Sequence, residues 1–199
     1  MIAYRLGDAL YLNLTNRCTN DCTFCLRRNR QGLAGQGLWL EAEPTADEVL
    51  RAIGDPRPYR EVVFCGFGEP LLRLDAVREV AAELRRKYPG VRVRVDTNGL
   101  ANLVYGRNVL PELAGLIDAI SISLNASTAE EYDRLCRPAL EGAFAAVLEF
   151  AREAVKFVPE VTLTAVDLPG VDLGACRQVA EGLGARFRVR RFIREDEGV

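Results

Sequence analysis

The chain has 199 residues, of which 49% are hydrophobic and 27% charged, and its formal net charge at pH 7 is −2. This composition is typical of a globular domain and excludes a fibrous or largely disordered chain. No apolar run approaches the ~20 residues of a membrane-spanning helix, and the N-terminus lacks a signal-peptide pattern, so we expect a cytoplasmic protein. The mild acidity gives no general attraction to nucleic acid or anionic lipid.

Strand-like apolar runs alternate with helical patterns along the chain. The predicted strands are Leu10–Thr15, Glu61–Cys65, Val91–Asp96, Ala119–Asn125, Val161–Val166 and Arg186–Ile193. The predicted helices are one that begins at Pro44, where Thr45 and Glu48 form a capping box, then Asp75–Tyr88, Val109–Ile117, Leu140–Phe157 and Asp172–Gly182, with a short turn at Ser127–Glu130. Such alternation indicates parallel strands joined by right-handed crossovers. We predict an α/β fold, a partial (βα)6 TIM-type barrel with parallel strands and outer helices, in which residues 1–199 form one domain.

One face of several predicted strands is polar. Ser121, Ser123 and Asn125 alternate with apolar residues, and the strands near residues 91, 161 and 186 show the same period of two. Helices normally cover one face of each strand in such a fold, so the apolar set must face them. We expect the polar set to face a ligand-filled interior, the alternative being a face in contact with water.

Three cysteines, Cys18, Cys22 and Cys25, follow the first predicted strand at the spacing Cys-x3-Cys-x2-Cys. A structural zinc site needs four protein ligands, and because the chain has no His, the fourth would be another Cys or a carboxylate. A disulfide framework would leave one of the three unpaired, and a chain of this length can bury a core without one. An iron–sulfur cube on three thiolates instead keeps one iron free for another ligand.

This motif, with Phe24 before its last cysteine, resembles the signature of the radical S-adenosylmethionine (SAM) superfamily. The resemblance implies that Cys18, Cys22 and Cys25 bind a [4Fe–4S] cluster whose open iron takes the amino and carboxylate groups of SAM. It also implies that an electron from the cluster cleaves SAM to a 5′-deoxyadenosyl radical, and that Phe24 lies near the adenine. We expect one cluster only, since no further cysteine cluster follows the sixth predicted strand.

Two further motifs fall at strand ends, where such folds bind ligands. The segment Gly66-Phe67-Gly68-Glu69-Pro70 resembles the superfamily's Gly-Gly-Glu-Pro motif with Phe67 in place of the first Gly, and Thr97-Asn98-Gly99 resembles its Thr-Asn-Gly turn. We expect Gly66 and Gly68 to let the backbone approach the ligand, and Glu69 to accept hydrogen bonds from the ammonium group of SAM. Thr97 and Asn98 are further candidates for contact with SAM.

Polar residues of the last strands complete the predicted SAM site, namely Ser121, Ser123, Asn125, Arg188 and Arg190. The hydroxyl and amide groups are placed to meet ribose hydroxyls or the SAM carboxylate. Together with Arg92 and Arg94, the arginines also suggest a substrate that carries a carboxylate or phosphate.

Three cysteines lie outside the motif. We expect Cys176 to be a small buried side chain of a helix. Cys65 and Cys136 lie on the face predicted to carry the chemistry, so either is a candidate to donate a hydrogen atom or to meet the substrate, and burial by packing is the alternative.

Residues 26–43 contain three arginines and three glycines, which suggests a mobile segment over the mouth of the barrel. Its Arg27, Arg28 and Arg30 are candidates to capture an anionic group. The alternative is a connecting loop whose Trp39 packs onto the domain.

The whole chain is similar to the compact radical SAM proteins associated with TatD-type nucleases, on the segments 14–18, 38–40, 136–138 and 187–190. We predict an enzyme that abstracts hydrogen from a small polar, anionic molecule, with flavodoxin or ferredoxin as electron donor and a functional link to a TatD-type nuclease. Two alternatives are an activating enzyme that forms a radical on a partner protein, and a non-catalytic iron–sulfur protein for electron transfer or sensing.

Overall fold

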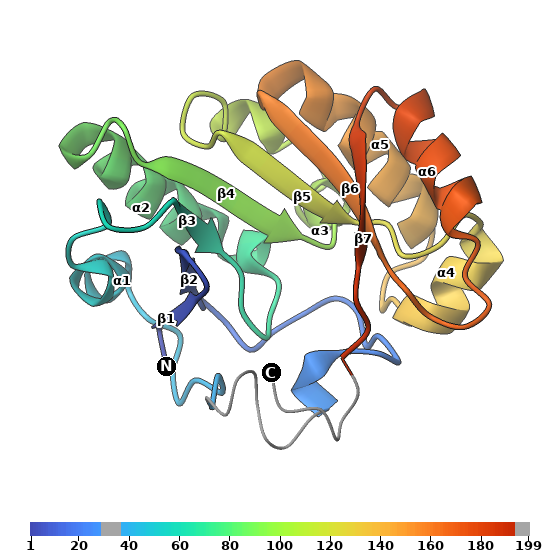
Figure 1. Cartoon of the computed structure of the whole chain (residues 1–199), viewed down its shortest axis with the longest axis horizontal. Coiled ribbons are helices and arrows are strands. Elements are labelled where there is room, and N and C mark those ends of the chain that lie inside the picture. Colours follow the sequence, from blue (N-terminus) through green and yellow to red (C-terminus); the bar gives the residue numbers. More distant parts are fainter. Residues whose placement is uncertain (29–36, 194–199) are drawn as a thin grey trace.

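The strands form one sheet in which spatial order follows chain order. A computed structural model of the chain describes residues 1–28 and 37–193. The seven strands are β1 (Ala3–Leu6), β2 (Ala9–Leu12), β3 (Glu61–Phe64), β4 (Arg92–Thr97), β5 (Ala119–Ser123), β6 (Glu160–Val166) and β7 (Arg186–Arg190) (Figure 1). From β2 to β7 every neighbouring pair is parallel, as predicted.

One strand was missing from the prediction. β1 pairs with β2 in an antiparallel hairpin, so the sheet has seven strands instead of six. The hairpin turns at Gly7, whose φ of +60° suits a residue without a Cβ atom. The first strand has only four residues, of which just Tyr4 is buried, and so short a run carries little periodic signal.

The helices agree with the predictions except in the middle of the chain. They are α1 (Ala46–Ile53), α2 (Leu74–Lys87), α3 (Ala101–Tyr105), α4 (Ala129–Cys136), α5 (Ala143–Phe157) and α6 (Leu173–Gly182), with 3-10 turns η1 (Leu26–Arg28), η2 (Pro70–Arg73) and η3 (Leu110–Glu112). The predicted helix Val109–Ile117 is wrong, because only η3 forms there and Gly115, with a φ of +75°, lies outside the helical conformation. The predicted short turn near Ser127 is instead the eight-residue helix α4, capped by Thr128.

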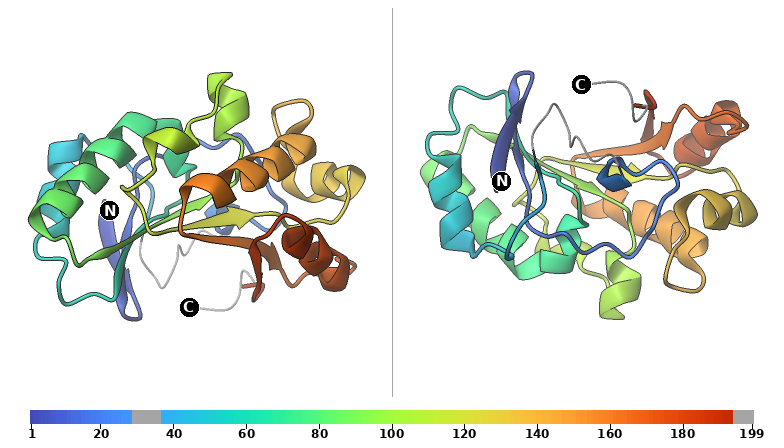
Figure 2. Two further views of the ribbon diagram at one scale, coloured as in Figure 1. Left: turned by 90° about the horizontal axis from the view of Figure 1, so that it is seen from above. Right: turned by 90° about the horizontal axis from the view of Figure 1, so that it is seen from below.

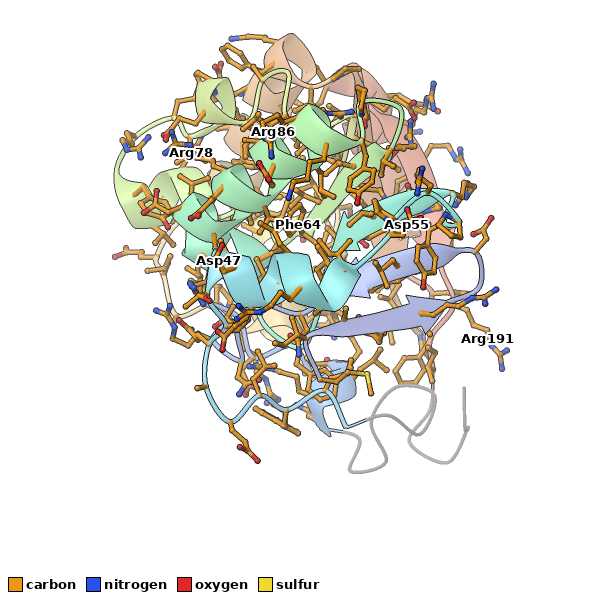
Figure 3. All side chains as sticks on the ribbon, turned by 90° about the vertical axis from the view of Figure 1, so that its left-hand side faces the viewer. Asp47, Asp55, Phe64, Arg78, Arg86 and Arg191 are labelled. Carbon is orange, nitrogen blue, oxygen red and sulfur yellow. The ribbon has the colours of Figure 1, made fainter. Side chains whose placement is uncertain are left out.

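The outer face of the sheet carries the hydrophobic core. Apolar residues of the central strands pack against α2 and α5 through buried side chains such as Val95, Ile122, Val80 and Phe150. Figure 2 shows these helices on the outer side of the sheet, and Figure 3 places Phe64 among the packed side chains beside α1 and α2. This burial holds the strands in register and so fixes where their carboxyl ends lie.

The inner face is polar, as the alternation predicted. The residues that share it include Glu61, Arg92, Arg94, Asp96, Ser121, Ser123, Thr162, Thr164, Arg188 and Arg190, which the strand register brings side by side. Several of them are buried, Thr164 being 1% exposed and Ser121 6% exposed. The face is therefore covered by protein in part and is not a simple solvated surface.

The helices of the described residues were also compared with the length and hydropathy that a bilayer requires. None of them meets both conditions for crossing a membrane.

Candidate functional site

The predicted cysteine motif lies in the segment that leaves β2 and ends in η1. In Figure 1 this segment passes below the sheet toward the side where β7 and α4 lie. It docks on the C-terminal end of α4 through the backbone, where the Thr23 amide donates to the Leu135 carbonyl at 2.9 Å and the Ala139 amide to the Thr19 carbonyl at 2.8 Å. Tyr132 of α4 also bonds the side chain of Asn20 at 3.0 Å. The loop that carries the thiols is thus held by a helix more than 100 residues further along the chain.

The three thiols are half-buried, and the surroundings of Cys18 and Cys22 favour the neutral form of these two when no metal is bound. Burial raises the pKa of Cys18 to about 11, and the nearby Glu69 carboxyl adds to the effect. A hydrogen bond with Cys136 and burial also raise the pKa of Cys22. A bound metal centre reverses this preference, because its positive charge stabilises thiolate ligands. The loop therefore becomes favourable for thiolates only when a metal centre is present.

The side chains of the cysteine loop were also compared with those that a metal ion or an iron–sulfur cluster requires. Among the described residues, no three His, Cys, Asp or Glu side chains gather around a point that would suit one metal ion. A cluster differs from a single ion because its thiolates bind separate irons, so the sulfurs need not converge on one centre. The side-chain oxygen of Asn20, within the same loop, is buried without a hydrogen-bond partner. The three thiols that this one loop carries match the number of thiolates that hold a cube with one open iron.

Glu69, at the start of η2, joins the ends of β3 and β4. Its carboxylate accepts hydrogen bonds from Thr97 Oγ1 at 2.8 Å, the Asn98 amide at 2.6 Å and the Leu71 amide at 3.0 Å. Burial raises its pKa to about 7 against the opposing effect of these donors. The side chain is 4% exposed, so its first role is to link two strand-end loops. Its contact with the ammonium group of SAM stays a prediction.

Gly66 and Gly68 are required by contacts within the protein. A Cβ atom on Gly66 would lie 2.0 Å from the side-chain oxygen of Asn13, and one on Gly68 would lie 2.2 Å from the Thr15 carbonyl oxygen. The loop after β3 therefore packs directly on the segment that leads to Cys18. This packing explains both glycines without a ligand, and the expected approach of their backbone to SAM stays a prediction.

The Thr97-Asn98-Gly99 turn contacts the cysteine loop. The side-chain amide of Asn98 donates to Thr19 Oγ1 at 2.8 Å and approaches Cys18 Sγ at 3.7 Å, while its oxygen accepts from the Leu100 amide at 3.0 Å. Gly99 has a φ of +79°, and a Cβ there would lie 2.9 Å from Ile122. The turn thus places an amide donor against a candidate ligand of the cluster.

The remaining predicted SAM-site residues form a hydrogen-bonded group on β5 and β7. Arg188 donates to Ser121 Oγ at 3.4 Å, and Arg190 donates to Ser123 Oγ at 3.3 Å and to Asn125 Oδ1 at 3.0 Å. Asn125 has a φ of +58° and reaches Cys136 Sγ at 3.9 Å with its amide nitrogen. The Nε atom of Arg190 is buried and has no partner among the described residues. This group therefore retains an unused donor.

The other two arginines of the polar face are already paired. Arg92 bonds Glu160 at 2.7 Å, and Arg94 bonds Asp96 at 2.6 Å and Glu61 at 3.3 Å. Their charges are balanced by protein carboxylates, and a role for Arg92 and Arg94 in capturing an anion stays a prediction. The alternation of Arg94 and Asp96 two residues apart on one strand face could have indicated this pairing.

The cysteines outside the motif have three different surroundings. Cys176 is fully buried in α6, as predicted. Cys65 follows β3 on the polar face beside Asp96, Arg94 and Arg190, and burial raises the pKa of its thiol. Cys136 is fully buried at the end of α4 and contacts Cys22.

The segment predicted to be mobile lies partly outside the described residues, which omit 29–36 and with them Arg30. Arg27 donates to the carbonyls of Asn16 at 3.2 Å and Asn20 at 3.1 Å, so it holds the loop together. Arg28 pairs with Asp21 at 2.6 Å.

Two aromatic side chains of this region pack onto the domain. Trp39 is 55% exposed and lies edge-on to Phe67, with ring centroids 5.5 Å apart. Phe24 packs against the main hydrophobic core, and its predicted place near the adenine is not tested.

Comparison with known proteins identifies the class. Residues 12–181 match the family model of the Radical SAM superfamily, and the chain belongs to this superfamily. Members of this superfamily use a [4Fe–4S] cluster and SAM.

Particular relatives share a name. The GTP 3′,8-cyclase of Paenarthrobacter nicotinovorans is 34% identical over 150 residues, which cover 72% of this chain and 39% of the relative. The enzyme of the same name from Corynebacterium glutamicum is 32% identical over 205 residues, which cover 96% of this chain and 50% of the relative. The chain thus spans half the length of these curated relatives or less.

A solved structure agrees on the fold. SuiB of Streptococcus suis, bound to the precursor peptide SuiA, matches with a TM-score of 0.69 and 15% identity, over 94% of this chain and 39% of that chain. At this identity the likeness shows the fold alone.

Proposed function

We propose that Cys18, Cys22 and Cys25 bind the [4Fe–4S] cluster and that SAM binds beside it on the polar face of the sheet. The observation that carries this proposal is a continuous set of contacts from the strand ends to the cysteine loop. Asn98 lies between Glu69 and Cys18, and Asn125 lies between Arg190 and Cys136, which in turn contacts Cys22. The motif residues predicted from separate parts of the sequence therefore meet around one loop.

The cluster and SAM together supply a 5′-deoxyadenosyl radical when electrons are available. The chain's own part is to position groups around that chemistry. Ser121, Ser123 and Asn125, held by Arg188 and Arg190, are proposed to meet the ribose hydroxyls and carboxylate of SAM. We assign the adenine to the neighbourhood of Phe24, and the backbone of Gly66, Gly68 and Thr97 to the methionine part. In this arrangement the polar face of the sheet lines the inside of a partial (βα)6 barrel, which forms one radical SAM domain.

We further propose that the substrate is a small anionic molecule, with purine nucleoside triphosphates the first class to examine. Arg190 supports this because its buried Nε atom has no partner among the described residues and its charge faces neutral oxygens of Ser123 and Asn125. Asp96 lies near enough to interact with Arg190 electrostatically but forms no ion pair with it among the described residues, so the guanidinium still has room for a ligand that brings negative charge. The name of the curated relatives, GTP 3′,8-cyclase, points to the same class.

Cys65 is our candidate for a residue that exchanges a hydrogen atom with the substrate. It lies on the polar face next to Arg190 and Asp96, and burial keeps its thiol neutral by raising its pKa. A neutral thiol is the form that can donate a hydrogen atom. Cys136 is placed instead against the cysteine loop, so it is less suited to meet the substrate.

The partners remain proposals by resemblance. A flavodoxin or ferredoxin would supply the electron, and a TatD-type nuclease would act in the same process.

One experiment tests cofactor use and substrate class together. The protein is reconstituted with iron and sulfide without oxygen, then given dithionite, SAM and uniformly deuterated GTP, with deuterated ATP as a second purine nucleotide and deuterated CTP as the matched control. We expect 5′-deoxyadenosine to form and to carry deuterium from GTP. If 5′-deoxyadenosine forms equally without any nucleotide and carries no deuterium, nucleoside triphosphates are not the substrate. If no 5′-deoxyadenosine forms with any nucleotide although the cluster has assembled, the proposed SAM site on the polar face of the sheet is contradicted.

A further inference from the structure

Carboxylates of the polar face differ in whether their oxygens are already bonded. Among the described residues, the strands of this face and the loop after β3 contribute Glu61, Asp96, Glu160 and Glu69. Glu61 bonds Arg94 through one oxygen and Arg92 through the other, at 3.3 and 3.5 Å. Glu160 uses one oxygen for Arg92 and the other for an arginine of β7. Glu69 accepts three hydrogen bonds that together use both of its oxygens.

Asp96 is the exception. Its Oδ1 atom accepts from Arg94 Nη1 at 2.6 Å, and no donor in the described part of the chain bonds its Oδ2 atom. Its side chain is 25% exposed, whereas that of Glu61 is 6% exposed. Asp96 is therefore the carboxylate of this face that keeps an oxygen free and within reach of a ligand.

Asp96 lies beside the hydrogen-bonded group on β5 and β7. The strand register pairs it with Ser121, whose hydroxyl accepts from Arg188 at 3.4 Å. Arg190 follows two residues later on the same face of β7, and its buried Nε atom has no partner among the described residues. The face thus offers an unused acceptor near an unused donor. A ligand that meets both must carry negative charge in one part and N–H or O–H groups in another.

Guanine nucleotides have this combination of groups. Their phosphates carry the negative charge, and the N1–H and 2-amino groups of the base are two adjacent donors. Adenine has an acceptor at N1 in place of that N–H, and a carboxylate can only accept. Two adjacent N–H groups also match the fork of a carboxylate, as in its pairing with arginine. An adenine placed in the same way would bring one acceptor against another, which weakens binding.

We propose that Asp96 is a specificity-determining residue that selects guanine over adenine nucleotides by accepting hydrogen bonds from the N1–H and 2-amino groups of the base. Its Oδ2 atom is free for one of these bonds, and Oδ1 has a second lone pair beside its bond to Arg94. This inference rests on the proposed substrate class. In the sequence, Asp96 is only one of the polar residues that alternate along this strand.

The first test changes the ligand and leaves the protein as it is. The full chain is loaded with its cluster without oxygen, no reductant is added, and calorimetry measures the affinity for GTP, 1-methyl-GTP, inosine triphosphate and ATP. The methylated nucleotide lacks the N1–H donor, and inosine triphosphate lacks only the 2-amino group. We expect GTP to bind roughly tenfold more tightly than 1-methyl-GTP and ATP, with inosine triphosphate between them, because a hydrogen bond to a charged group is lost. Equal affinities for GTP, 1-methyl-GTP and ATP would overturn the proposal.

The second test compares Asp96→Asn with Glu61→Gln, two changes that each remove one carboxylate charge beside Arg94. Arg94 only donates, so in Asp96→Asn the amide oxygen should face it and the amide nitrogen should replace Oδ2. That nitrogen donates to N1 of adenine but opposes the N1–H of guanine. We expect Asp96→Asn to weaken GTP binding roughly tenfold and to leave ATP binding as tight or tighter, while Glu61→Gln keeps the preference of the natural chain. A GTP preference that survives in Asp96→Asn, or disappears equally in Glu61→Gln, would overturn the role of Asp96.

Other outcomes assign Asp96 to a different group of a ligand. Equal losses of GTP and ATP affinity in Asp96→Asn would place the ribose, which both nucleotides share, at this carboxylate. A loss of SAM affinity with unchanged GTP affinity would place SAM there, and either result refutes this inference alone. If the natural chain with an assembled cluster binds no purine nucleotide, the proposed substrate class fails as well. Where circular dichroism shows that Asp96→Asn does not fold, the comparison of nucleotides on the natural chain decides by itself.

Discussion

The two ends of the polar face differ in how their arginines are paired. Toward the amino ends of the strands, Arg92 and Arg94 bond Glu61, Glu160 and, further along β4, Asp96, so the charges are balanced within the protein. At the carboxyl ends, Arg188 and Arg190 bond hydroxyl and amide oxygens that carry no charge. The first, which we call the closed end, has its arginines paired with carboxylates of the protein. The second, which we call the open end, has arginines whose hydrogen-bond partners are uncharged, so a bound anion can balance their charge.

This difference explains how one sheet supports both stability and binding. Ion pairs link β4 to its neighbour β3 through Arg94 and Glu61 and, across β5, to β6, where the small side chain of Ala119 leaves room for Arg92 to reach Glu160. The open end lies at the carboxyl ends of the strands, where parallel α/β folds bind their ligands. Substitutions at the two ends should accordingly affect different measurements.

The largest effect is expected for the cysteine loop at the open end. Cys18→Ala, Cys22→Ala and Cys25→Ala should each lose the iron–sulfur cluster, since each removes one of three thiolates. The Cys176→Ala control should retain it. Iron and acid-labile sulfide are measured after reconstitution, and circular dichroism should show that all four variants fold. A full complement of iron in any of the three loop variants would contradict the ligand assignment.

The second largest effect is expected on stability, at Glu69 of the open end. Its carboxylate accepts hydrogen bonds from uncharged donors. Its pKa in the folded protein is about 7, above the ordinary 4.5, so the folded state holds the proton more tightly than the unfolded state. Its contribution to stability is therefore fully present below about pH 4.5 and falls as the pH rises to 7, by roughly 3 kcal/mol over that gap.

The comparison that isolates this effect uses Glu69→Gln, which cannot titrate. Urea unfolding of metal-free protein between pH 4.5 and 8 should show the natural chain losing stability relative to the variant as the pH rises. A stability difference that stays constant over this range would contradict the raised pKa.

A smaller effect is expected at the closed end. Arg94→Met leaves Asp96 and Glu61 without their shared partner and should cost about 2 kcal/mol, below the ~3–5 kcal/mol of a fully buried pair because water still reaches the Asp96 side chain. Urea unfolding measures the loss, and nucleotide binding should be unchanged. A variant that keeps its stability but binds nucleotide more weakly would reverse the roles given to the two ends.

The matching change at the open end is Arg190→Met, with the smallest expected effect. Binding of GTP or SAM to the reconstituted protein should weaken roughly tenfold, equal to about 1.4 kcal/mol, because one charged donor is lost. Stability should change less than in Arg94→Met, since the partners that remain, Ser123 and Asn125, carry no charge. Isothermal calorimetry measures the affinity, and unchanged affinity for both ligands would contradict the assignment.

Much of the fold followed from local patterns, but the pairing of charges did not. The period of two predicted the six parallel strands and the polar face, and the capping box of Thr45 and Glu48 predicted the start of α1, which the structure confirms. The hairpin strand β1 was missed because four residues give little periodic signal. Sequence spacing also gave Arg94 and Arg190 the same role, since it does not show which carboxylates neighbouring strands bring close.

For the candidate site as well, local sequence patterns predicted the motifs but not the contacts between distant parts of the chain. The cysteine motif and the strand-end motifs can be found in the sequence because they are continuous, and the structure brings them together. The contact of Cys136 with Cys22 depends on how the end of α4 docks on a loop more than 100 residues earlier, which no local pattern encodes. The glycines at 66 and 68 could be found by their motif, but their packing against Asn13 and Thr15 could not.

The most direct test of the central claim is metal and sulfide analysis of the natural chain prepared without oxygen, combined with electron paramagnetic resonance of the reduced protein before and after SAM is added. We predict four irons and four sulfides per chain, as a [4Fe–4S] cluster contains, and a spectrum that changes when SAM binds at the open iron. One zinc per chain with no sulfide, or a cluster whose spectrum is indifferent to SAM, would contradict the account.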